Sequence, residues 1–75
     1  MFPLEYLHGC ERGEIAEVDG APDFVSRMAD LGLRVGSRVR MIQPGSPCLV
    51  EVDSTRLSLR LHDAAQVLVR PLARS

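Results

Sequence analysis

The middle of the chain alternates between apolar and polar residues in short stretches that turn residues interrupt. Val39 and Met41 alternate with Arg38 and Arg40. The same period of two returns over residues 48–53 and, with the leucines inward and Arg56 and Arg60 outward, over residues 56–61. Successive side chains of a strand point to opposite faces of its sheet, so this pattern predicts three half-buried β-strands. The expected inward-facing residues of the second and third strands are Cys48, Val50, Val52, Leu57, Leu59 and Leu61.

Turn residues and two further apolar runs complete the expected strands. Residues 43–47 (Gln-Pro-Gly-Ser-Pro) predict a loop, and Asp53-Ser54 predicts a tight turn. A strand of about five residues is expected within residues 13–20, where a bulge or strong twist would reconcile Ile15 with Val18. The last strand is expected over residues 66–70, after one helical turn at residues 62–65.

The segment from Ala21 to Leu31 predicts the one long helix. Pro22 suits the first turn, and Phe24, Met28 and Leu31 form an apolar stripe at helical spacing. Gly32 then stands where a left-handed residue ends a helix, and Leu33 follows in position to touch Met28.

These elements predict a mainly β fold, with about five short strands in a small, partly open barrel and one inserted α-helix. The helix is expected to cap one end of the barrel or to fill the gap between the first two strands. Residues 1–12 are expected to form an extended lead-in or a short turn. A chain of 75 residues has room for one domain, which we assign to residues 1–75.

Charge and composition exclude several functions. The net charge is −1, and all nine basic residues are Arg, so neither a P-loop lysine nor a Schiff-base lysine is possible. The signs are segregated: residues 1–30 hold seven acids and two Arg (−5), and residues 31–75 hold three acids and seven Arg (+4). A general nucleic-acid binder usually has a clear basic excess, which this total does not supply. No apolar run approaches the ~20 residues of a membrane span, and the N-terminus lacks a secretory signal.

Neither a metal site nor a catalytic site is expected. His8, Cys10, Cys48 and His62 could converge, but they lack the paired spacing of zinc ligands, so solvated histidines and free thiols are the favoured interpretation. No hydroxyl lies in a nucleophile elbow, and Cys10 stands beside Glu11 in the acidic half. No cofactor is expected either.

The arginines are the stronger candidates for a functional surface. If the strands that carry Arg38, Arg40, Arg56 and Arg60 are neighbours, four guanidiniums share an outer face that could bind an acidic partner. The alternative is a solvated face whose arginines pair with acids of the same chain.

Four stretches, in this order along the chain, resemble the FeoA family: Glu11-Arg12-Gly13-Glu14-Ile15, RMADLGLRVGSRV from Arg27, RLSLR from Arg56, and Ala64-x-x-Val67-x-Val69. The resemblance covers about residues 4–72 and implies an SH3-like barrel with an inserted helix. It also implies a cytoplasmic, non-enzymatic accessory protein of bacterial ferrous iron uptake. Its implied partner is a membrane transporter with a cytoplasmic GTPase domain. Two departures, at residues 44–47 and at Asp53-Ser54, would alter any contact made there.

Other functions stay open at this point. The family also occurs behind DNA-binding domains in metal-dependent repressors, but no helix-turn-helix precedes this chain, which favours the stand-alone transporter accessory. A nucleic-acid-binding domain that uses the Arg-rich strands is the main alternative, and an arginine supplied in trans to a GTPase is a minor one. The chain could also form a homo-oligomer.

Overall fold

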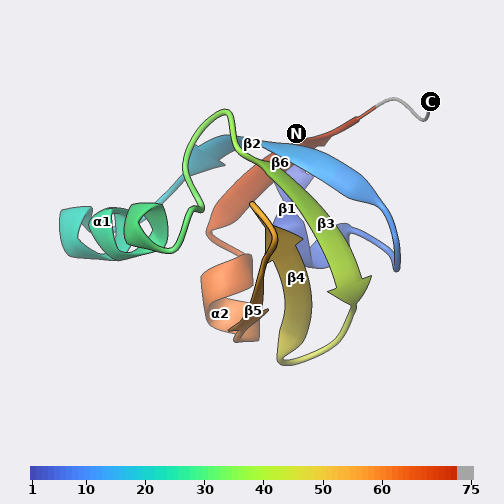
Figure 1. The fold of residues 1–75 in the computed structure, drawn as a ribbon. Helices are drawn as coiled ribbons and strands as arrows, with labels where there is room; N and C mark the ends of the chain where they lie inside the picture. Colours follow the sequence, from blue (N-terminus) through green and yellow to red (C-terminus); the bar gives the residue numbers. More distant parts are fainter. Residues whose placement is uncertain (73–75) are drawn as a thin grey trace.

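Six β-strands form one antiparallel sheet in the order β1-β6-β2-β3-β4-β5 (Figure 1). The structure is a computed structural model that describes residues 1–72. The strands are β1 (Phe2–Pro3), β2 (Arg12–Val18), β3 (Arg38–Gln43), β4 (Cys48–Val52), β5 (Thr55–Leu59) and β6 (Val67–Pro71). A 3₁₀ turn, η1 (Leu4–Tyr6), and two helices, α1 (Pro22–Asp30) and α2 (Leu61–Ala64), connect them.

The alternation of buried and exposed residues in β3 and β4 is as the sequence predicts. Val39 and Met41 of β3 are buried while Arg38 is exposed, and Cys48, Val50 and Val52 of β4 are all buried. The β4–β5 turn consists of Asp53 and Ser54, whose φ angles of 50° and 65° are both left-handed, as a type I′ hairpin turn requires. The expected bulge in β2 is also present, between Ile15 and Glu17.

Helix α1 ends as the sequence predicts. Gly32 adopts a φ of 96°, the Leu33 N–H donates to the Met28 carbonyl over 2.8 Å, and the Gly32 N–H donates to Ala29 over 2.9 Å. These two hydrogen bonds make a Schellman motif, and they bring Leu33 into the core together with Met28. Figure 1 shows α1 at one side of the barrel, where the chain passes from β2 to β3.

Three expectations from the sequence are wrong. Leu31 is 40% exposed and follows the last residue of α1, so it does not extend the buried part of the apolar stripe. Leu61 begins α2 instead of ending a strand, since β5 stops at Leu59. The strand count is the third: residues 1–12 hold the expected short turn, η1, which places Leu4 in the core, but the extended residues before it form a strand, β1, that pairs with β6 at Phe2↔Val69. The expected five strands therefore become six.

The core lies between the inner face of the curved sheet and the segments that cover it. Strands β2, β3, β4, β5 and β6 contribute alternate residues, η1 and α2 contribute Leu4 and Ala64, and Leu7 follows η1. No polar or charged residue is buried within residues 1–72. Function therefore has to be sought on the outer face of the sheet and in the connections.

Candidate functional site

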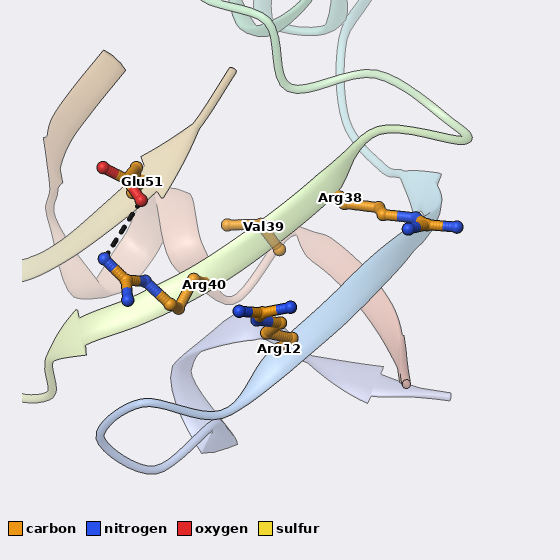
Figure 2. A pocket seen from close by; sticks show the side chains of 5 residues that line it. All are labelled: Arg12, Arg38, Val39, Arg40 and Glu51. Carbon is orange, nitrogen blue, oxygen red and sulfur yellow. Dashed lines mark hydrogen bonds and ion pairs between the residues drawn. The ribbon is translucent and has the colours of Figure 1, made fainter. Parts of the chain in front are cut away.

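A hollow of about 270 Å³ lies on the outer face of the sheet, where β2, β3 and β4 run side by side. Its lining residues are Arg12, Arg38, Val39, Arg40 and Glu51, and we call it the arginine hollow. Figure 2 shows the Arg40 side chain reaching toward Glu51 of β4, while Arg12 and Arg38 lie on the β2 side. The residues that line the space thus carry three guanidiniums and one carboxylate.

The strand pleat explains why these side chains meet. In β3, Val39 points into the core, so Arg38 and Arg40 on either side of it point outward. The antiparallel register then places Arg12 opposite Arg40 and Glu14 opposite Arg38. On the other side, Glu51 of β4 lies opposite Arg40.

Gly13 keeps β2 close enough to its other neighbour to hold this register. It is buried, and a Cβ atom added there would lie 3.2 Å from Val69 Cβ and 3.3 Å from the Arg70 carbonyl oxygen. Because these distances are shorter than an ordinary contact, a larger residue would require the β2–β6 contact to shift by a few tenths of an ångström. Gly13 therefore permits the close approach of β2 to β6 next to Arg12.

Only one of the three arginines has an acidic partner in the described part of the chain. Arg40 Nη2 donates to Glu51 Oε1 over 3.0 Å, and the two side chains are 39% and 30% exposed. The Arg40 Nε atom is buried and has no hydrogen-bond partner among residues 1–72. In the same residues, neither Arg12 nor Arg38 has a carboxylate oxygen within 4.0 Å.

Two like charges face each other across β2 and β3. Arg12 and Arg40 are directly opposed in the register, a placement that destabilises a sheet. The Arg40–Glu51 ion pair compensates one of the two charges and leaves the other uncompensated. The hollow therefore carries a local positive excess, although the chain as a whole has a net charge of −1.

The four predicted arginines do not form one continuous face. Arg38 and Arg40 line the hollow, but β4 separates β3 from β5, so Arg56 lies opposite Glu51 on the far side of β4. Arg60 follows the end of β5 and is exposed. Sequence reasoning missed Arg12, although the alternation of Arg12 with Gly13 would have placed it on the outer face once β2 was extended by one residue.

The four histidine and cysteine residues come from three parts of the fold: His8 and Cys10 from the connection between η1 and β2, Cys48 from β4 and His62 from α2. Cys10 is exposed and Cys48 is buried in β4. His8 and His62 are exposed, and His62 Nε2 lies 3.1 Å from Gln66 Nε2. Within residues 1–72, no group of three or more His, Cys, Asp or Glu is arranged to hold a metal ion.

A model of the FeoA domain matches residues 2–71 of this sequence. The chain belongs to the FeoA family. Two solved FeoA structures are similar over most of it. The FeoA of Stenotrophomonas maltophilia, in complex with zinc, is 31% identical, with 93% of this chain and 91% of that chain covered and a TM-score of 0.83. The FeoA of Chlorobium tepidum is 30% identical, with 95% and 70% covered and a TM-score of 0.86.

The comparisons also confirm the fold class. The Stenotrophomonas maltophilia FeoA is described as a prokaryotic SH3 domain protein, so the expected SH3-like barrel with its inserted helix is correct. A manganese-dependent transcriptional repressor shares this fold at 22% identity and a TM-score of 0.84, over 93% of this chain and 41% of the repressor. No curated protein matches the sequence. Among the helices of residues 1–72, none has the length and apolarity to cross a membrane.

Proposed function

We propose that this FeoA-family chain is a non-enzymatic, cytoplasmic accessory protein of bacterial ferrous iron uptake. It acts by contacting the cytoplasmic, GTPase-bearing part of the membrane transporter. The family match over residues 2–71 carries this proposal. It is supported by the description of the Stenotrophomonas maltophilia FeoA as a candidate ferrous iron transport activating factor, because that protein is 31% identical and the similarity covers 93% of this chain.

The structure is compatible with a role through contact and offers little for catalysis. The arginine hollow has no nucleophile or general base among its lining residues, whose reactive groups are three guanidiniums and one paired carboxylate. Guanidiniums are suited to binding carboxylates or phosphates in a fixed orientation. An accessory protein that docks through its surface therefore fits the chemistry of the site better than an enzyme does.

Ferrous iron uptake in a strain that lacks this chain tests the proposal. We expect uptake of radiolabelled ferrous iron to fall on deletion and to recover when the wild-type chain is expressed from a plasmid. The Leu33→Asp variant, which places a charge in the core, serves as the non-folding control and should not restore uptake. Uptake that is unchanged by the deletion contradicts the proposal.

GTP hydrolysis by the full-length transporter, measured with and without the purified chain, separates two ways of acting. A change in hydrolysis would mean that the contact reaches the GTPase domain and regulates it. Unchanged hydrolysis together with lost uptake would mean that the chain assists assembly or gating instead.

A further inference from the structure

The arginine hollow has more positive charge than its own residues compensate. Its lining includes three guanidiniums but only one carboxylate, that of Glu51, which is already bound to Arg40. Glu14 lies opposite Arg38 in the register but makes no ion pair with it within 4.0 Å. Among residues 1–72 the guanidinium donors of Arg12 and Arg38, both exposed, thus have no carboxylate partner and are open to an outside acceptor.

We propose that the arginine hollow binds a carboxylate side chain from an acidic segment of the partner protein. Guanidinium groups bind carboxylates through two parallel N–H···O bonds, which hold the acceptor in a defined orientation. Arg12 and Arg38 provide these donors, and Arg40, held by Glu51, borders the site. Arg12 and Arg40 repel each other across β2 and β3 in the unbound protein. A bound carboxylate beside them would reduce this repulsion.

The size of the hollow favours a single side chain. Its volume of about 270 Å³ is below the ~300–1,000 Å³ of a pocket for a drug-sized ligand. An Asp or Glu side chain enters such a space, while the rest of the acidic segment lies across the strand surface.

The surrounding charges favour a protein segment over a nucleic acid. A nucleic-acid backbone carries its phosphates in a continuous row, so it needs a basic track and not one basic hollow. Next to the hollow, β2 continues with Glu14 and Glu17, and Asp19 follows it. An extended polyanion would meet all three of these acids, whereas one carboxylate at Arg12 and Arg38 has only Glu14 as its acidic neighbour among them.

The identity of the partner rests on the proposed function, whereas the chemistry of the hollow does not. Two binding measurements therefore test the identity of the partner and the chemistry of the hollow separately. The first uses the full-length transporter in lipid nanodiscs, and the second uses a hexaglutamate peptide as a probe of the hollow alone. Both use the full chain and compare wild type with Arg12→Glu/Arg38→Glu and with Arg60→Glu, an exposed arginine that does not line the hollow.

We expect wild type and Arg60→Glu to bind the transporter with similar affinity, and the double variant to bind about 10- to 100-fold more weakly. The peptide should shift the Arg12 and Arg38 side-chain NMR signals of the wild-type chain, and ~500 mM salt should weaken both interactions. The milder Arg12→Gln/Arg38→Gln variant should lose most of the binding as well, and circular dichroism checks that each variant is folded.

The outcomes are distinguishable. If wild type and the double variant bind the transporter equally well, the hollow is not the docking site, although the proposed function stands. If wild type binds the peptide through Arg12 and Arg38 but does not bind the transporter, the proposed function fails and the carboxylate site stands. Binding of a single-stranded DNA at ~50 mM salt that depends on Arg12 and Arg38, with no binding of the peptide, would overturn the choice of a carboxylate.

Discussion

Arg12 and Arg40 face each other across two neighbouring strands, and the sheet has to hold them together. Opposed like charges in an antiparallel pair destabilise it by roughly 0.2–1 kcal/mol. Since Glu51 binds only Arg40, the repulsion from Arg12 is not removed within the described residues. A placement that lowers stability is typical of a surface that serves binding.

Replacing Arg12 should therefore stabilise the fold. We expect Arg12→Thr to raise the free energy of unfolding by about 0.2–1 kcal/mol in urea denaturation at low salt, with a smaller gain at high salt. Arg38→Thr is the matched control, because it makes the same change in strand propensity on β3 but removes an arginine opposite Glu14. An equal gain in both variants would mean that threonine propensity, and not charge repulsion, is responsible.

The two thiols differ in their surroundings, and their reactivity should differ accordingly. Cys10 is exposed, whereas Cys48 is 1% exposed and its burial raises the pKa of the thiol above the ordinary value of 9.0. The folded chain therefore keeps the Cys48 proton at a pH where the unfolded chain loses it. The free energy of unfolding should then fall as the pH rises past about 9.

Thiol titration and alkaline unfolding measure these effects. A disulfide reagent should modify one thiol quickly in the native protein and the second only after denaturation. Cys48→Val should flatten the loss of stability above pH 9. Two thiols that react equally fast in the native state would contradict the burial of Cys48.

At the scale of elements, the end of α1 depends on one glycine. Gly32 has a φ of 96°, and an added Cβ would meet no atom closer than 3.6 Å, so a substitution there strains the backbone without a steric clash. The Schellman hydrogen bonds that follow place Leu33 in the core. The backbone conformation of Gly32 therefore connects the helix to the barrel.

We expect Gly32→Ala to lower the free energy of unfolding by about 1–2 kcal/mol, the ordinary penalty for a left-handed residue that carries a Cβ. Gly9→Ala is the control, because Gly9 has no left-handed φ and a Cβ there would meet nothing within 4 Å. Chemical denaturation of both variants makes the comparison. A similar loss in the two would show that helix termination at Gly32 does not contribute.

Helices and strands were predictable from the sequence where the residues that determine them lie close together along the chain. The alternation in β3 and β4 and the glycine that ends α1 each depend on residues within a few positions of one another. The strand order is not local, so the sequence did not reveal that β4 lies between β3 and β5 and divides the four expected arginines. The two-residue β1 was missed for the same reason, because its pairing with β6 joins the two ends of the chain.

Because of this strand order, the acidic and basic parts of the sequence do not form separate acidic and basic faces of the protein. Residues 1–30 are acidic and residues 31–75 are basic, which suggested one acidic and one basic side. In the fold, however, β2 from the acidic part lies between β3 and β6 from the basic part. Glu14 is consequently opposite both Arg38 and Arg70. The positive excess is confined to a hollow and does not extend over a whole face.

The stability of the whole molecule depends on its first turn. Leu4 is fully buried, and η1 packs against α2 and β6. Leu4→Ala should lower the free energy of unfolding by about 2–5 kcal/mol. That is a large share of the ~4–11 kcal/mol expected for a domain of this size. Thermal and urea unfolding measure the loss.

Tyr6→Ala is the control for this segment, because Tyr6 belongs to the same turn and is 63% exposed. Its effect should stay within about 0.5 kcal/mol. If Leu4→Ala were as mild as Tyr6→Ala, the N-terminal turn would be an accessory to the barrel and not part of its core.

The pairing of β1 with β6 allows the ends of the chain to be joined and the chain to be opened at another loop. Phe2 lies opposite Val69, so the sheet brings together strands from the two ends of the sequence. A circularly permuted chain, joined across these strands and opened in the loop of residues 44–47, would retain every strand pair. The β3–β4 hairpin, local in the natural order, would become the pairing of greatest sequence separation. In exchange, the pairings of β6 with β1 and β2, which span most of the natural chain, would become more local. The permutant would thus reach the same barrel with its long-range closure moved from β6 to the β3–β4 pair.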